Sequence, residues 1–423
     1  MITNEQFEEL ILLYIKPLFG IHKIEPCDLT CNNCVSQTTD GKIKVSLKKS
    51  RSQFLLQRNQ SFTPGEVALL EKIMMSWKNT FRYNYDEKLL KTIALYSLQE
   101  AIALYISRPS SNVVHKIIDL FDSWASETYE GQKIVFSIGI IDSTHPEANK
   151  RSIDFFKIDS EDYLKVVTSG FDTIVVINSQ GHVIKHESLP FPEPDDEEHM
   201  LAPLPFLPIA NWTKKLQYSI CLNRAGEILI FKDKEPLLAK RRGKWKFFTH
   251  SAYIKSMHIH SENTRNGLKI RKALYVTMLD TSFQRKGACI GFMPRSKIID
   301  KEKIRNDFQI IQGNDYLGSS SNKSVFLSSL TNQKKFHELS RNLRQELLSI
   351  DGATVILDDG QILSAGAILQ IPAGSSGGGR KAAAHVLAHY GLGVKVSNDG
   401  KISFWKDLTE ETPADEPPIY EIG

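Results

Sequence analysis

Two aspartate-glycine turns between apolar runs constrain the last third of this chain more than any other feature of the sequence. Residues 358–360 (DDG) join the runs ATVILDD and QILSAGAILQI, and residues 398–400 (NDG) join VKVS and KISFW. An Asp-Gly pair between two apolar runs is typical of a β-hairpin, because the favoured turn needs residues that tolerate positive φ. The two turns therefore predict two antiparallel hairpins.

Further runs and helical patterns extend the two hairpins into a domain predicted over residues 266–408. KALYVTMLD and GACIGFMP add two apolar runs, and QKKFHELSRNLRQELLSI and RKAAAHVLAHY have helical spacing. This alternation is typical of a mixed β-sheet with helices on its faces. The fold class predicted for the whole chain is α/β, in the α+β sense, with a helical region and a β-rich or mixed domain before this sheet.

The chain of 423 residues is longer than one hydrophobic core usually supports, so two or three domains are expected. Residues 1–130 contain long helical patterns such as DEKLLKTIALYSLQEAIALYI and are interpreted as a helical region. Residues 131–265 contain short β-like runs such as DTIVVINSQGHVIKHE and are interpreted as a mixed α/β domain. Residues 189–208 are expected to form an exposed loop, and residues 409–423 a mobile acidic tail.

The composition is that of an ordinary soluble globular protein, with 41% apolar and 24% charged residues. The formal net charge of +4 is small and the basic residues are scattered, so nucleic acid is not an expected partner. No apolar run approaches the ~18 residues of a membrane span, and LILLYI lacks a basic lead. The five cysteines fit a reducing compartment, so the expected location is cytoplasmic, without a membrane partner.

Two groups of cysteine and histidine could bind a metal on spacing alone. Cys27, Cys31 and Cys34 lie close together in CDLTCNNC, but zinc sites normally combine two pairs and the sequence holds no second pair. A turn-rich segment with ordinary thiols is the favoured interpretation. His258 and His260 fall on one face of an expected strand. A solvated strand face is favoured there, because no third ligand is near in sequence.

A loop of small residues, 374–379 (GSSGGG), opens directly onto Arg380 and Lys381 at the start of an expected helix. The helix dipole disfavours cations at this end, but exposed backbone N–H groups and two cations together suit a polyphosphate. A flexible loop with a solvated first turn is the alternative. The spacing also suggests a Walker A loop, which fails because Lys381 is one position late and Ala382 replaces the magnesium-binding hydroxyl.

Asp351 stands where an expected helix ends at Ser349 and an expected strand begins. Taken alone, an aspartate at such a junction is most simply a turn former. One hairpin separates it from the glycine loop, and both are expected at the edge of the same sheet. A carboxylate and a phosphate loop in these positions can hold a divalent cation between their oxygens. Asp351 is therefore the predicted metal ligand.

These segments carry a resemblance. The order DGATVILDDGQILSAGAILQI, loop, GGRKAAAHVLA and GVKVSNDGKISFW resembles the core of the diadenylate cyclase domain. That family includes the DNA-integrity scanning protein and the membrane-associated cyclic di-AMP synthases. KGACIGFMP resembles the family's early Gly-Ala strand, which packs beside the adenine. The resemblance implies that two ATP-loaded domains face each other, with each 3′-hydroxyl attacking the other nucleotide's α-phosphate to close cyclic di-AMP.

The resemblance also assigns roles by position. Asp351, Arg380 and Lys381 would be catalytic, and Asp351 would hold Mg²⁺ or Mn²⁺ bound together with ATP. The residues implied in nucleotide binding are Gly287, Ala288, Gly352, Ala353, Gly377, Gly378, Gly379 and Arg380. The implied partners are ATP, cyclic di-AMP and a second copy of the chain, in a homodimer or a higher oligomer.

The chain departs from the family at the helix start. Where the family has Thr-Arg-His-Arg after a glycine, residues 379–382 read GRKA, so a hydroxyl, a histidine and an arginine are missing. The favoured function is an active diadenylate cyclase gated by a sensor domain within residues 131–265. The alternative is a weakened domain that binds ATP or a cyclic dinucleotide and reports it. A third interpretation, an interaction scaffold, is opposed by the retained Asp351 and Arg380.

Overall fold

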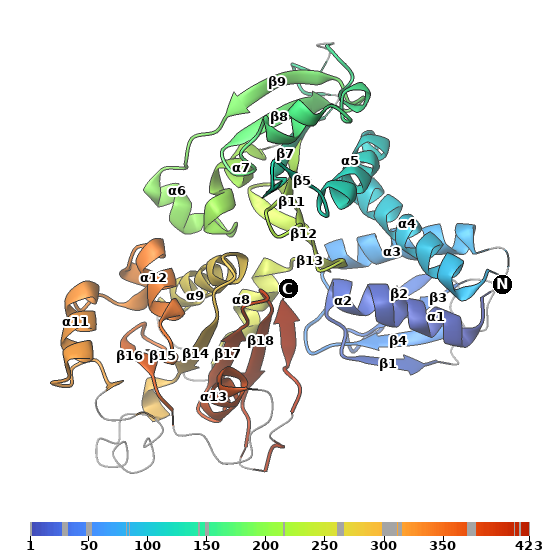
Figure 1. The fold of residues 1–423 in the computed structure, drawn as a ribbon. Helices are drawn as coiled ribbons and strands as arrows, with labels where there is room; N and C mark the ends of the chain where they lie inside the picture. The colour runs from blue at the N-terminus through green and yellow to red at the C-terminus, as the bar shows by residue number, and fades with distance from the viewer. Residues whose placement is uncertain are drawn as a thin grey trace. The chain divides into compact units, whose positions relative to one another are not determined.

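In a computed structural model of the protein, the described residues are 2–27, 33–47, 53–81, 83, 85–142, 144–148, 152–214, 216–259, 266–297, 311, 315–369, 378–409, 411–413 and 416–422. The chain divides into two compact units, Met1–Thr249 and His250–Gly423, named here the N-terminal and the C-terminal unit (Figure 1). Each unit combines helices with a mixed sheet, which confirms the α+β class. The predicted division of the first unit near residue 130 stays a prediction.

The N-terminal unit begins with helix α1 (Asn4–Leu10), which is capped by the Thr3 side chain. A four-stranded antiparallel sheet follows, in the order β1 (Lys23–Pro26), β4 (Gln53–Gln57), β3 (Ile43–Ser46) and β2 (Val35–Gln37). The purely helical interpretation of residues 1–130 is therefore wrong for these segments. Strands of three to five residues hold too few positions to show a period of two in the sequence.

Three helices follow this sheet: α3 (Pro64–Thr80), α4 (Glu87–Ile106) and α5 (Ser111–Trp124). Helix α4 packs against both others, and the Trp77 indole N–H donates to the Ala94 carbonyl at 3.1 Å. Within the described part of the chain, α4 alone is long and apolar enough to cross a membrane, and half of its most apolar window is buried inside the fold. Its packing is that of a core helix.

A seven-stranded sheet completes the N-terminal unit, in the order β13-β12-β11-β10-β7-β8-β9. Its strands are β7 (Phe136–Ile141), β8 (Thr173–Asn178), β9 (Val183–Ser188), β10 (Gln217–Leu222), β11 (Ile228–Lys232), β12 (Glu235–Arg241) and β13 (Lys244–Phe247). Strands β7 and β8 are parallel, and the other neighbours are antiparallel. The run DTIVVINSQGHVIKHE forms β8 and β9 as expected, while the bounds of a separate middle domain stay a prediction.

The segment expected as an exposed loop, residues 189–208, folds instead. It contains α6 (Pro194–His199) and the short helix η4 (Leu204–Phe206), and it leads into α7 (Leu207–Trp212). Its prolines stand near the helix starts, where a missing N–H costs little. Ala202 and Phe206 are buried, so the loop interpretation is wrong for the second half of the segment.

The C-terminal unit is built on a six-stranded sheet, in the order β16-β15-β14-β17-β18-β19. Its strands are β14 (Ala288–Met293), β15 (Ala353–Leu357), β16 (Ile362–Ala367), β17 (Leu392–Val396), β18 (Ile402–Lys406) and β19 (Tyr420–Ile422). Strands β14 and β15 are parallel. The two predicted hairpins, β15–β16 and β17–β18, are antiparallel as expected, and their glycines, Gly360 and Gly400, both have φ of +85°.

Helices cover both faces of this sheet. Along β15, Ala353 and Val355 belong to the cluster that packs on α13 (Gly379–Ala388), whereas the Thr354 hydroxyl donates to the carbonyl of Leu347 in α12 (Arg341–Ser349). Helix α9 (Gly267–Phe283) packs against α12 (Figure 1). The run KALYVTMLD, expected as a strand, lies inside α9. That helix is buried almost all round, so its sequence shows no helical period.

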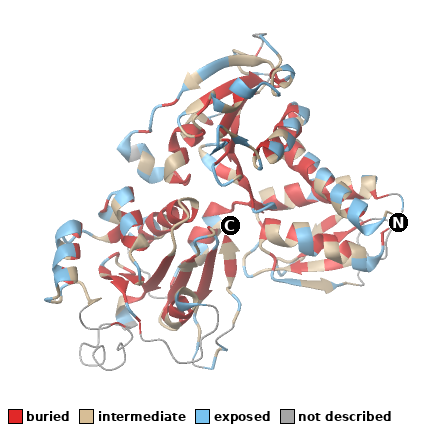
Figure 2. Cartoon of the chain, in the orientation of Figure 1, coloured by how far each residue is buried: buried red, intermediate tan, exposed pale blue. Residues whose placement is uncertain are grey.

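The six-stranded sheet ends in β19 on one side and in β16 on the other. Strand β19 pairs with β18, and Tyr420 stacks on Phe404 at 4.2 Å between ring centroids. The expectation of a mobile tail over residues 409–423 is therefore wrong for β19, which is largely buried (Figure 2). At the other edge, Tyr316 and Ile311 form isolated bridges with Ser364 and Leu369, in and just beyond β16.

A buried ion pair joins two helices of the C-terminal unit. Arg341 of α12 donates to both carboxylate oxygens of Asp280 in α9, from Nε at 2.7 Å and from Nη2 at 2.8 Å. Both side chains are fully buried. Such a paired geometry satisfies two charges that would otherwise be costly to remove from water.

Candidate functional site

The predicted anion site lies at the first turn of α13. Gly378 is the N-cap residue, with φ of +83°, and no side chain caps the helix. The N–H groups of Lys381 and Ala382 donate to the Gly378 carbonyl at 3.0 and 3.2 Å. Within the described part of the chain, no atom would lie within 4 Å of a side chain added at Gly378 or Gly379. Among the described residues, space is therefore open beside these two glycines, while Gly377 and the loop before it lie outside the described residues.

Arg380 connects the ends of three elements at this helix start. Its Nη2 lies 3.9 Å from Oδ1 of Asp351, which directly precedes β15. Its Nη1 donates to the side-chain oxygen of Asn398, in the turn after β17, at 3.3 Å. The predicted meeting of Arg380 with Asp351 at one end of the sheet is present in the structure.

Gly287, just before β14, leaves the space that Arg380 occupies. A Cβ atom at this position would lie 2.5 Å from Arg380 Nη1 and 2.3 Å from the Asn398 side-chain oxygen, both below any normal contact. Any side chain at residue 287 would therefore displace the guanidinium. The next residue, Ala288, is buried, and it pairs with Val396 across β14 and β17.

Asp351 lies just before β15, where the backbone comes very close to β16. Gly352 has φ of +109°, and a Cβ there would lie 2.5 Å from the backbone carbon of Gly366 in β16. Gly366 has φ of +64° and itself packs under the Asp351 carbonyl. These two glycines allow the turn before β15, while Ala353 is already in the buried core. The Asp351 side chain is fully exposed, so its carboxylate is accessible to a cation or a ligand.

The electrostatic surroundings of α13 are cationic. Lys381 is half-buried and forms no ion pair with any residue that the structure describes. Burial, together with the charges of His389 and Lys381, lowers the pKa of His385 in the same helix. Burial also raises the pKa of the Cys289 thiol to about 12, and the Arg380 charge only partly opposes this. The nearest cysteine is therefore a buried thiol rather than a nucleophile.

Sequence reasoning missed two parts of the site. Asn398 was interpreted only as a turn residue, although its side chain accepts from Arg380. Asp315 accepts the Ile368 backbone N–H at 2.9 Å and the Lys323 ammonium at 2.8 Å, and Lys323 also donates to the Gly366 carbonyl. This group holds β16 beside Asp351. Burial opposes ionisation of Asp315, but Lys323 and the Ile368 N–H outweigh it and lower its pKa.

The two alternative metal groups gain no support. The run holding His258 and His260 was expected as a strand, but helix α8 (His250–Ser256) forms there instead, and His258 follows it outside any strand. His260 and Cys31 lie outside the described residues, so neither group can be assembled in full. Among the residues that are described, no three His, Cys, Asp or Glu side chains are close enough to hold a metal ion.

Comparisons with known proteins give a limited result. The sequence matches no family profile and no curated protein. Among solved structures, the chain is similar to a double mutant of DacA, a diadenylate cyclase from Staphylococcus aureus. The identity is 18% and the TM-score 0.23, and the similarity covers 36% of this chain and 92% of that chain. At this identity and TM-score, the similarity does not identify the function of the chain.

Proposed function

We propose that the C-terminal unit binds ATP at the start of α13, and that two copies condense two ATP molecules into cyclic di-AMP. The observation that carries this proposal is the position of Arg380. Arg380 lies in the first turn of α13, beside the exposed Asp351 carboxylate. Its guanidinium occupies a space that exists because residue 287 is a glycine. Cation, carboxylate and helix N–H groups are the parts that a metal-bound triphosphate requires.

In this proposal Arg380 donates two parallel hydrogen bonds to phosphate oxygens, and the N–H groups at the start of α13 add further donors. Asp351 offers one accessible carboxylate, which fits Mg²⁺ or Mn²⁺, since such ions often bind through one or two carboxylates plus substrate phosphates. The metal would neutralise charge on the phosphates. Lys381 adds a second cation near the same helix start.

The proposed reaction balances between two nucleotides. Each 3′-hydroxyl passes its proton to the exposed Asp351 carboxylate and forms a bond to the α-phosphorus of the other ATP. The bond from each α-phosphorus to the bridging oxygen breaks, and pyrophosphate leaves. One unit holds one ATP, so a second copy must supply the attacking hydroxyl. Product formation should therefore rise faster than linearly with enzyme concentration until the dimer saturates.

A second candidate function is nucleotide binding without turnover. The substituted helix start favours it: Ala382 is buried, so it offers neither a hydroxyl nor a charge to the ligand. The loss of a single charge-stabilising contact can cost about 10²–10³ in rate. Binding depends more on Arg380 and on the backbone, which are retained.

The test is incubation of the purified chain with ATP and Mn²⁺ or Mg²⁺, followed by chromatographic separation of the products. We expect cyclic di-AMP from the native chain and none from Asp351→Asn. Asp359→Asn is the matched control, because Asp359 lies in the turn at the opposite end of β15, paired with Arg295 at 2.6 Å. ATP binding without product would favour the second candidate function, and neither binding nor product would refute both.

A further inference from the structure

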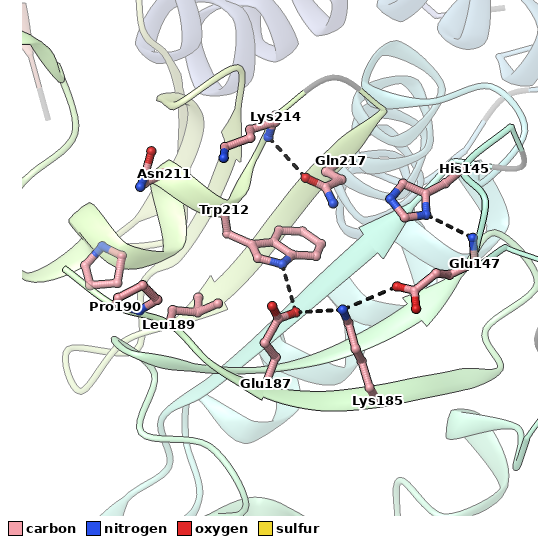
Figure 3. Close-up of a pocket in the computed structure, with 11 residues that line it drawn as sticks. His145, Glu147, Lys185, Glu187, Leu189, Pro190, Asn211, Trp212, Lys214 and Gln217 are labelled. Carbon is pink, nitrogen blue, oxygen red and sulfur yellow. Dashed lines mark hydrogen bonds and ion pairs between the residues drawn. The ribbon is translucent and has the colours of Figure 1, made fainter. Parts of the chain in front are cut away.

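A cavity of about 340 Å³ opens in the N-terminal unit. It is lined by β9, by α7 and by the start of β10 (Figure 3). Ligand pockets in proteins typically begin near this size, and they combine apolar walls with a few polar groups. Leu189, Pro190 and Pro208 supply apolar wall here.

Trp212, at the end of α7, forms the flat wall of the cavity. Its indole N–H donates to the Glu187 carboxylate at 3.2 Å. The ring packs over Gly139 of β7, where a Cβ atom would lie 2.5 Å from the indole edge. The indole is thus held in place by a hydrogen bond and by a missing side chain, and its face suits a planar group.

On the β9 side of the cavity, two carboxylates surround one ammonium group. The Lys185 ammonium lies 3.2 Å from Glu187 and 3.3 Å from Glu147, between the two carboxylates. Burial opposes the charge of Lys185, but the two glutamates outweigh it and raise its pKa. Two carboxylates share one ammonium here, so this wall has a net negative charge and directs an anion to the opposite wall.

The α7–β10 side instead presents hydrogen-bond donors. The Gln217 side-chain oxygen accepts the Lys214 backbone N–H at 3.3 Å, so its amide N–H groups remain as donors. The Lys214 ammonium has no carboxylate partner among the described residues, and in Figure 3 its side chain extends toward Asn211. A cation and two amides on one side of an indole are suited to an anionic group.

We propose that this cavity binds a small planar anion, with its ring on Trp212 and its carboxylate or phosphate at Lys214, Asn211 and Gln217. The ligand is a small molecule, because the cavity is too small for a folded partner. This site does not take part in the nucleotide chemistry proposed above. It lies within the predicted sensor region, and a small planar anion would be the ligand sensed there.

The test uses four probes and isothermal titration calorimetry on the full chain. 1-Naphthoate and 1-naphthyl phosphate carry a planar ring and an anion, 1-naphthamide lacks the charge, and cyclohexanecarboxylate lacks the planar ring. We expect at least one naphthyl anion to bind with a Kd below about 1 mM, and both other probes to bind roughly tenfold more weakly. The stronger of the two naphthyl anions identifies the anionic group.

Two variants assign the binding to this cavity. Lys214→Ala should weaken the naphthyl anion roughly tenfold, the effect of losing a charge-assisted contact. The matched control is Lys244→Ala, an exposed lysine on β13 at the far edge of the same sheet, which should leave the affinity unchanged. Equal binding of 1-naphthamide, equal loss in the two variants, or no binding by either naphthyl anion would overturn the proposal.

Discussion

The C-terminal unit contains two aspartate–arginine pairs that differ in almost every physical respect. Arg341 and Asp280 are fully buried and form two contacts, at 2.7 and 2.8 Å. Arg380 and Asp351 form one contact at 3.9 Å, with the arginine 40% exposed and the aspartate fully exposed. The first pair has no capacity for a ligand, whereas the second keeps nearly all of its hydrogen-bonding capacity. The same two residue types thus serve packing in one place and are available for recognition in the other.

The difference has a thermodynamic reason. Removing one partner from a buried pair leaves a charge in a medium that cannot solvate it, whereas an exposed pair at long distance contributes little to folding. Stability measurements should therefore respond to the buried pair, and binding measurements to the exposed one. Four substitutions test this contrast, from the largest expected effect to the smallest.

Arg341→Ala should lower the free energy of unfolding by about 3–5 kcal/mol, because it removes the guanidinium that donates two hydrogen bonds to the buried Asp280 carboxylate. Urea denaturation followed by circular dichroism measures this. Arg380→Ala is the comparison and should change the same quantity by less than about 0.5 kcal/mol. Equal losses in the two variants would mean that Arg380 is a structural residue.

Arg380→Ala should weaken ATP binding by about 1–3 kcal/mol, the range for losing a charge-assisted contact. Adenosine binding should barely change, because the nucleoside carries no phosphate. Calorimetric titration with both ligands gives the two values. If ATP binds the variant as tightly as the native chain, the phosphate-binding interpretation of α13 is wrong.

Gly287→Ala should weaken ATP binding by about 1–2 kcal/mol while both charges of the pair remain. The added methyl group would overlap the position of the Arg380 guanidinium and force it away from Asp351. Titration with ATP, together with a circular dichroism spectrum like that of the native chain, checks this. Unchanged affinity would show that Arg380 need not hold its present position.

Asn398→Ala should have the smallest effect, about 0.5–1 kcal/mol on ATP binding, since it removes one hydrogen bond at 3.3 Å that positions Arg380. In the double variant Asn398→Ala with Arg380→Ala, the Asn398 substitution should add nothing further. Additive losses would instead indicate a direct contact between Asn398 and the nucleotide.

The two hairpins of the C-terminal unit, and the closeness of Asp351 to Arg380 that follows from them, could be predicted from the sequence. Several other helices and strands could not. The Asp-Gly turns specified two antiparallel pairs, and the order of segments then brought Asp351 and Arg380 to one end of the sheet. Helix α9 was misread, because a helix buried almost all round loses the polar face that reveals its period. The strands β1 to β4 were missed because each is too short to show alternation.

Within the site, the residues that could not be predicted depend on three-dimensional neighbours. Asn398 precedes an Asp-Gly pair, so its turn role hides its contact with Arg380. Asp280 and Arg341 are 61 positions apart, and nothing in the sequence between them indicates that their helices pack together. Gly287 was singled out only through a resemblance, and its physical reason, the space for a guanidinium, is visible only in the folded chain.

The edges of the six-stranded sheet in the C-terminal unit limit how two copies could associate. An unpaired edge strand would offer a row of backbone donors and acceptors, and a second chain could extend the sheet by adding a strand. Here the edge strand β19 is only three residues long and offers few backbone groups, and the bridges of Tyr316 and Ile311 occupy part of the outer side of β16. A dimer of this unit should therefore form through side chains and loops, and its affinity should depend on the identity of surface residues more than on backbone hydrogen bonds. Such an interface can be loosened or tightened by single substitutions without disturbing the sheet beneath it.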